Sequence, residues 1–455
     1  DSMEKTPRLA VRVIAGLLAV LLVLPARAQE GLAAVAQNQS CTVEELLDSG
    51  TFAPGDSVSD WFAVAAGRSG EDVRTEGYRK SLSDYVTQKY RKEGGLDSVR
   101  ATEWHRIALA LLALGGDPTD VGKNHIDLIA DGTYAWKTTD SLGKQGLNGW
   151  IFALIALDSA RFAVAQDAAY PREAMLTALL SGQEQNGGFG LAAGSTDVDI
   201  TAMALQALAP YRNGTVVYDL SGGRRTTVQQ ALDRALQWLS AQQTENGDFI
   251  SWGAPNAEST AQVLIALCAL GIDPATDARF CKNGVSAADG LRRYRLENGL
   301  YAHVLENGAD YMATEQSILA EEAMERMETG ARSLYDFRPP MQDALRTEIA
   351  ALNDEIDSAG DDALRTQAEA LYARYLAVPA EERSYVSAFA RLRAALEETG
   401  RTLEPEDPAA AYDLRLPTEP SASGSGIVWV AGGAAAVLLL GSGVIVWMRK
   451  RKCTK

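Results

Sequence analysis

A short turn motif recurs along the chain and limits its architecture more than any other feature. Asn-Gly or Asp-Gly, followed after one residue by an aromatic, occurs at 131–134, 186–189, 246–249 and 298–301, at intervals of 50 to 60 residues. Asn-Gly tolerates positive φ, so it can end a helix and reverse the chain. A fixed period of this length is typical of an array of repeated structural units.

A helix is predicted after each turn and between the turns. Segments rich in Ala and Leu lie at 61–66, 104–114, 147–157, 200–208, 259–270 and 313–324, and they are apolar on nearly all sides. Segments at 81–90, 172–180 and 228–241 carry apolar residues on one stripe only. Fully apolar helices must be buried, and two-faced helices must cover them. We therefore predict an all-α fold, an (α/α)6 toroid of two concentric helical layers over residues 40–337.

The turns also resemble those of a known superfamily. The pattern Gln-x-x-Asn-Gly-x-Phe at 183–189 and 243–249 is similar to the repeats of squalene cyclases and protein prenyltransferase β subunits. Segments 197–208 and 312–316 resemble a bacterial surface branch of that superfamily, which includes the toroid of cobalamin carriers such as intrinsic factor and transcobalamin. The resemblance implies the toroid fold. It makes a cobamide a conceivable ligand, although no cofactor is expected.

One catalytic candidate follows from that resemblance. Type II terpene cyclases protonate an alkene with the middle acid of an Asp-x-Asp-Asp motif. Asp199 matches that acid and Asp197 its neighbour, but Ile200 replaces the last Asp. The alternative is that Asp199 caps a helix beginning at Ile200. Prenyltransferases hold zinc with Asp, Cys and His, and no such set occurs at the corresponding repeats; His303 is interpreted as an isolated histidine, and no metal site is expected.

A binding site is predicted where the inner helices begin. Acidic and aromatic residues gather near those N-terminal ends and in the turns, and such a mixture suits a sugar, an amphiphile or a cationic group. The alternative for each Trp is that it fills core volume. The predicted ligand-binding residues are Trp61, Trp104, Trp150, Asp197, Asp199, Trp252, Glu258, Tyr301, Tyr311 and Glu315.

The chain after the predicted ring changes character twice. Residues 341–400 are rich in Ala, Glu and Arg, with apolar residues at helical spacing, which predicts a small helical bundle acting as a spacer module. Residues 401–426 hold four prolines and then Ser-Gly repeats, which is typical of a linker.

Both ends predict export and membrane attachment. Residues 1–28 have the basic, apolar and small-residue segments of a signal peptide, with an uncleaved N-terminal anchor as the alternative. Residues 427–448 are uncharged and long enough for one transmembrane helix, and the basic tail 449–455 is expected in the cytoplasm. The predicted location is the cell membrane, single-pass, with an extracellular toroid. The alternative is a variant cell-wall sorting signal around 416–420.

Charge and cysteines complete the prediction. A net charge of −17 argues against a nucleic-acid partner. Cys268 and Cys281 are close enough in sequence to form a disulfide in an oxidising exterior. We therefore predict a membrane-anchored surface protein whose toroid binds a small molecule, glycan or surface protein without catalysis. A terpenoid cyclase using Asp199 and a structural adhesin are the alternatives.

Overall fold

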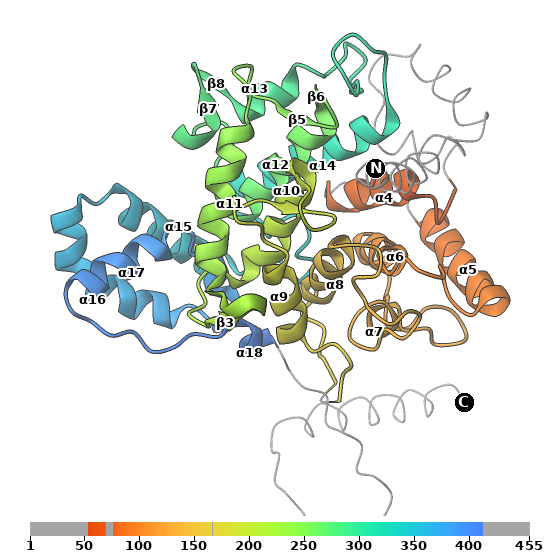
Figure 1. Cartoon of the computed structure of the whole chain (residues 1–455), viewed down its shortest axis with the longest axis horizontal. Coiled ribbons are helices and arrows are strands. Elements are labelled where there is room, and N and C mark those ends of the chain that lie inside the picture. The colour runs from red at the N-terminus through yellow and green to blue at the C-terminus, as the bar shows by residue number, and fades with distance from the viewer. Residues whose placement is uncertain (1–52, 70–75, 166, 413–455) are drawn as a thin grey trace, which may run out of the picture. The chain divides into compact units, whose positions relative to one another are not determined.

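The computed structural model describes residues 53–69, 76–165 and 167–412. Within them, six helices form a closed inner ring: α4 (Ser57–Arg68), α6 (Thr102–Ala113), α8 (Asn148–Asp158), α10 (Val198–Leu208), α12 (Ala257–Ala269) and α14 (Tyr311–Glu328). Each packs against the next, and α14 packs against α4 (Figure 1). The predicted apolar helices are thus the inner wall of a ring.

A second layer of helices covers the first. It consists, in the described chain, of α5 (Glu76–Glu93), α7 (Leu128–Gly132), α9 (Arg172–Ser181), α11 (Val228–Gln242) and α13 (Ala287–Arg292). Each packs against an inner helix beside it in sequence. The apolar stripe of α11 faces inward, where Leu232, Leu236 and Leu239 are buried. This pairing confirms the predicted mostly helical ring of two layers, with five outer helices against six inner ones in the described residues.

Two of the repeated turns are held by a glutamine three residues before their Asn-Gly pair, whereas Arg295 stands at that position before Asn298-Gly299. Gln183 Nε2 donates to the carbonyls of Gly187 and Ala231, both at 2.8 Å. Gln243 Nε2 makes the equivalent bonds, at 3.0 Å to Gly247 and 2.9 Å to Phe280. One amide therefore closes its own turn and also ties that turn to the outer layer.

A threonine in each of three inner helices fixes the aromatic residue of its turn. Thr201 Oγ1 accepts from the backbone N–H of Phe189 at 2.8 Å. Thr260 accepts from Phe249 at 3.1 Å, and Thr314 accepts from Tyr301 at 3.0 Å. The three aromatic side chains are fully buried. The first copy of the motif differs, because Gly132 ends α7 and its carbonyl contacts His105 Nε2 at 2.6 Å.

Short antiparallel hairpins stand where the turns meet the inner helices. Before α10 and α12, β1 (Phe189–Gly190) pairs with β2 (Thr196–Asp197), and β5 (Phe249–Ser251) pairs with β6 (Ala254–Asn256). Before the outer helices α11 and α13, β3 (Tyr218–Asp219) pairs with β4 (Arg225–Thr226), and β7 (Cys281–Lys282) pairs with β8 (Val285–Ser286). The sequence did not predict them. Strands β2 and β6 end at Asp197 and Asn256, the N-cap residues of α10 and α12. The hairpins thus set where two inner helices begin.

Single-turn 3-10 helices join several elements. They are η1 (Ala209–Tyr211), η2 (Ser221–Gly223), η3 (Ala278–Phe280) and η4 (Ala380–Tyr385).

Residues after the ring form a helical group with its own core, as predicted for 341–400. Its helices are α15 (Asp343–Ser358), α16 (Asp361–Ala377) and α17 (Phe389–Glu398), and α18 (Pro408–Tyr412) follows. Leu352, Ile356 and Leu392 are fully buried in the core of this group. We call α15 to α17 the helical module; its role as a spacer stays a prediction.

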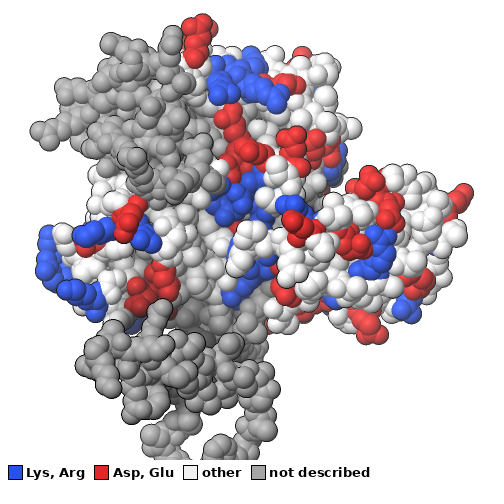
Figure 2. All heavy atoms as spheres, turned by 180° about the vertical axis from the view of Figure 1, so that it is seen from behind, with Lys and Arg blue, Asp and Glu red and all other residues white. Residues whose placement is uncertain are grey.

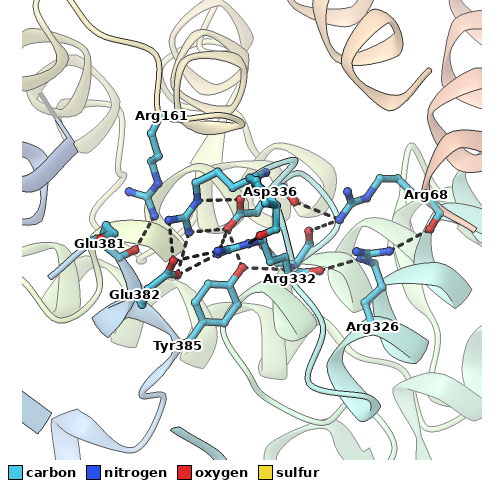
Figure 3. Close-up of polar contacts among 11 residues, drawn as sticks. Arg68, Arg161, Arg326, Arg332, Asp336, Glu381, Glu382 and Tyr385 are labelled. Atoms are coloured by element: carbon cyan, nitrogen blue, oxygen red, sulfur yellow. Dashed lines mark hydrogen bonds and ion pairs between the residues drawn. The ribbon is translucent and has the colours of Figure 1, made fainter. Parts of the chain in front are cut away.

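The helical module is fastened to the ring by buried ion pairs (Figure 3). Arg332, which follows α14, donates through both terminal nitrogens to the carboxylate of Glu382 in η4, at 2.9 Å each. Tyr385 donates to Asp336 at 2.9 Å, and Arg338 bridges Asp336 and Glu382 at 2.7 and 3.0 Å. Charged side chains are costly to bury unless they are paired, so this network favours one geometry between the ring and the helical module.

The predicted disulfide is wrong. Cys268 and Cys281 are both free thiols. Cys268 lies in the last turn of α12. Cys281 lies near the other end of that helix, because the carbonyl of the preceding residue, Phe280, accepts a hydrogen bond from Gln243 in the turn before α12. A 13-residue helix is about 20 Å long, which separates the two cysteines.

Several predicted segments lie outside the described residues. They are the signal peptide 1–28, the transmembrane helix 427–448, the tail 449–455, the alternative sorting signal and most of the linker. Of the helices that are described, none has the length and apolar character to cross a bilayer. On the face drawn in Figure 2, acidic and basic side chains are interspersed over the described surface, so the negative charge is not gathered in one patch there.

Candidate functional site

Three neighbouring inner helices bring acidic residues together where they begin. Asp199 lies in the first turn of α10, Glu258 in the first turn of α12, and Glu315 in the second turn of α14. Because α10, α12 and α14 pack side by side, these carboxyls lie at one end of the ring. We call Asp197, Asp199, Glu258 and Glu315 the acidic cluster.

Asp197 has a structural role that had been considered for Asp199. Its Oδ1 accepts from the backbone N–H groups of Asp199 and Ile200, at 2.9 and 3.1 Å, and caps α10. Ser251 Oγ donates to its other oxygen at 2.6 Å. The helix begins at Val198, so the alternative interpretation of Asp199 as a cap is wrong. Asp199 therefore does not cap α10.

The Asp199 side chain is half-buried, with one carboxyl oxygen enclosed and unsatisfied. Its Oδ1 has no hydrogen-bond partner among the described residues. Burial, with the negative charge of Asp197 beside it, raises the pKa of Asp199 to about 7. At neutral pH this carboxyl therefore exists in both protonation states, so it can donate a proton or accept a hydrogen bond.

Glu315 is the most buried acid of the cluster. Its side chain is 2% exposed, and in the described part of the structure no group bonds its Oε2. Burial and the charge of Glu258 raise the pKa of Glu315 well above its usual range. A buried carboxyl oxygen without a partner costs free energy, so its retention here is consistent with a ligand donor.

Glu258 has a partner that sequence analysis missed. His303 Nδ1 lies 2.9 and 2.8 Å from its two carboxylate oxygens, so His303 is a hydrogen-bonded histidine at the surface. Burial raises the pKa of Glu258, and the hydrogen bond from His303 opposes that shift. The pair lies at the more open edge of the cluster, since the His303 side chain is half exposed.

A line of glutamines connects the same three helices. Gln206 Nε2 donates to Gln262 Oε1, and Gln262 Nε2 donates to Gln316 Oε1, both at 3.0 Å. The sequence held a signal for it, because Gln262 and Gln316 both stand two residues after the turn-binding threonine of their helix. The line ties α10, α12 and α14 together beside the acidic cluster.

Aromatic side chains cross the interior of the ring. The ring of Trp61 on α4 lies 5.9 Å from that of Phe152 on α8, although α6 stands between these helices in the inner wall. Tyr335, beyond α14, lies 6.1 Å from Trp61. All three are half-buried. An aromatic cluster therefore fills part of the interior. Among the described residues, Trp61 is the predicted tryptophan that belongs to this cluster.

The other predicted aromatics lie elsewhere. Trp104 is 2% exposed and donates to the Tyr90 hydroxyl at 2.7 Å, between the inner and outer layers. Tyr301 and Tyr311 are buried in the core, and Trp150 packs on Tyr170. Core packing explains the side chains of Trp104, Tyr301 and Tyr311, whereas Trp150 is half-buried and lines a separate hollow with Gly143 and Leu191.

Trp252 stands at the tip of the β5–β6 hairpin, 71% exposed, with φ of 55°. It directly follows Ser251, whose hydroxyl bonds Asp197 of the acidic cluster. The structure thus brings together the four predicted acids, with Trp252 on the hairpin that bonds one of them. Among the described residues, no group of three or more His, Cys, Asp or Glu side chains is arranged to hold a metal ion.

Comparisons with known proteins add a structural likeness. No protein-family model matches the chain, and no curated protein matches it. Among solved structures it is similar to Candida albicans protein geranylgeranyltransferase-I complexed with GGPP, with a TM-score of 0.42 and 11% identity over 68% of this chain and 89% of that one. At this similarity we transfer neither substrate nor reaction, and the toroid assignment comes from the pairing of the helices.

Proposed function

We propose that this chain is a membrane-anchored surface protein whose toroid binds a small cationic or hydrogen-bond-donating ligand at the acidic cluster, without catalysis. The observation that carries the proposal is the pair of buried carboxyl oxygens, Asp199 Oδ1 and Glu315 Oε2, that lack partners among the described residues. An ammonium or amidinium group supplies the N–H donors that both oxygens lack.

The charge balance favours a cation over a neutral donor. Asp199, Glu258 and Glu315 all have raised pKa values, for which burial is the first cause and neighbouring negative charge a further one. A bound cation stabilises the ionised carboxylates and lowers those pKa values. Binding should therefore release protons and tighten as the pH rises through 7.

The test is calorimetric titration of the full chain with benzamidine and with tetramethylammonium at pH 6 and pH 8. We expect tighter binding at pH 8, and loss of binding in both Asp199→Asn and Glu315→Gln. Asp219→Asn is the matched control, because that carboxyl is exposed on β3. Unchanged affinity in the two buried variants, or equal affinity at the two pH values, would contradict the proposal.

Two parts of the proposal rest on sequence alone. A cobamide remains a proposed ligand, and quenching of tryptophan fluorescence by cobalamin tests it. Surface display rests on segments 1–28 and 427–448. Removal of residues 427–455 should release the exported protein from the membrane fraction, and an unchanged membrane fraction would rule out that anchor.

A second candidate function is terpenoid cyclisation, and one observation favours it. Asp199 is buried with a pKa of about 7, so a protonated carboxylic acid is present near neutral pH. Such an acid can transfer its proton to an alkene carbon, leaving a carbocation and the Asp199 carboxylate. Incubation of the full chain with squalene or geranylgeranyl diphosphate should then give cyclic products that Asp199→Asn abolishes. Absence of products removes this candidate and leaves the binding proposal intact.

A further inference from the structure

A cavity lies at the opposite end of the ring from the acidic cluster, under the helical module. Its volume is about 210 Å³, and its walls come from the C-terminal ends of α12 and α14 and from α15. A smaller cavity of about 60 Å³ shares Ile265, Ala269, Leu334 and Tyr385 with it. Ligand sites occur preferentially at such junctions between parts of a protein.

The larger cavity is too big to be a packing defect. Protein interiors are packed about as densely as organic crystals, and voids larger than a water molecule are few. At roughly 30 Å³ per water, this cavity holds a body of about seven non-hydrogen atoms, and apolar cavities of roughly 150 Å³ already accept benzene. The walls include Ile265, Met327 and Ile349, which suit an apolar body.

The charged residues around the cavity have one sign. Arg212 and Arg346 are among the described residues that line it, and none of those residues is Asp or Glu. Arg212 is 6% exposed, so its guanidinium lies in a medium where charge interactions are strong. Arg346 binds the exposed Asp343 through one nitrogen at 2.9 Å. In a chain with a net charge of −17, an all-cationic lining is a local exception that selects for an anion.

We propose that this cavity is a second binding site, which takes a small organic monocarboxylate with a compact apolar body. Its carboxylate pairs with the guanidinium groups of Arg212 and Arg346, because a planar guanidinium matches the two oxygens of a carboxylate. Its apolar part lies against the wall that α12 and α14 provide. Because α15 of the helical module forms part of the wall, a carboxylate bound in the cavity contacts both that module and the ring.

Hexanoate is the probe, with hexylamine as its cationic counterpart. Calorimetric titration of the full chain should show saturable binding of hexanoate and none of hexylamine. Arg346→Gln should weaken binding by about tenfold or more, as expected for loss of a charge-assisted hydrogen bond. Arg292→Gln, an exposed arginine on α13, is the matched control and should leave the affinity unchanged.

Location is tested in two independent ways. Ala269→Leu places a larger side chain in the wall shared by both cavities and should abolish binding. In a chain carrying Cys41→Ser and Cys453→Ser, hexanoate should slow alkylation of Cys268, which lines the cavity, but not of Cys281. The second measurement holds even if Ala269→Leu fails to fold. Equal binding of hexylamine, no saturation at millimolar hexanoate, or unprotected Cys268 would each overturn the proposal.

Discussion

Replacing the hydroxyl of Thr260 with a methyl group tests how the repeats are held together. Thr260 is fully buried, and its Oγ1 accepts the backbone N–H of Phe249 at 3.1 Å. Thr260→Val keeps the shape of the side chain but leaves that N–H without an acceptor. A buried donor without a partner costs about 1–3 kcal/mol, so we expect the free energy of unfolding to fall by about 2 kcal/mol.

The measurement is urea unfolding followed by far-ultraviolet circular dichroism. Thr260→Ser keeps the hydroxyl and should recover most of the loss. Thr366→Val is the matched control, because Thr366 is exposed on α16 and bonds only the preceding turn; we expect a change within about 0.5 kcal/mol. Thr201→Val, the equivalent change in α10, should add its own loss, since the two threonines share no bonding partner.

The reasoning is refuted if Thr260→Val unfolds at the same urea concentration as the parent chain. It is also refuted if Thr260→Ser is as destabilised as Thr260→Val, because then side-chain volume and not the hydroxyl would decide stability. Either outcome would mean that the threonine does not fix the turn.

Three further perturbations have distinct expected results. In thermal unfolding, Gly247→Ala should lower the free energy of unfolding by at least about 3 kcal/mol, because φ is +86° and the new Cβ would lie 2.2 Å from the Ser286 carbonyl oxygen. Gly299→Ala is the control: φ is +82° but the new Cβ meets open space, so the loss should be only about 1–2 kcal/mol. Glu382→Gln should lower the free energy of unfolding by about 3 kcal/mol, because it removes one of the two buried carboxylates that neutralise Arg332 and Arg338 and leaves both with Asp336 alone. Burial raises the pKa of Asp199 to about 7 in the folded protein, against about 4 for an ordinary aspartate. Between these pH values the folded state holds a proton that the unfolded state has lost, so the free energy of unfolding falls as the pH rises from about 4 to 7. Urea unfolding at pH 8 should find Asp199→Asn more stable than the parent chain, with the difference shrinking toward pH 4.

Much of the ring could be predicted because its helices carry strong local patterns. The segment predicted at 147–157 is α8 at Asn148–Asp158, and the segment at 228–241 is α11 at Val228–Gln242. Boundaries failed where a hairpin decides them. Helix α10 begins two residues before Ile200, because β2 delivers Asp197 to the cap position. Strands of two or three residues are too short to show an alternating pattern.

The candidate site was predicted in part for a similar reason. Carboxyls near the starts of neighbouring inner helices must meet once the ring closes, so Asp199, Glu258 and Glu315 were expected together. The contact of His303 with Glu258 joins residues 45 positions apart through an irregular loop, which no local pattern indicates. The aromatics failed because composition does not tell which side of an inner helix a Trp occupies, and Trp104 points outward to Tyr90.

The central claim is that Asp199 is a buried, incompletely satisfied acid at a ligand site, and its own titration tests this most directly. Infrared difference spectra of the full chain, recorded between pH 4 and pH 9, should show a protonated carboxyl band that disappears with a midpoint near pH 7 and is absent from Asp199→Asn. Loss of the Asp199 band at the ordinary aspartate value of about 4 would contradict the account.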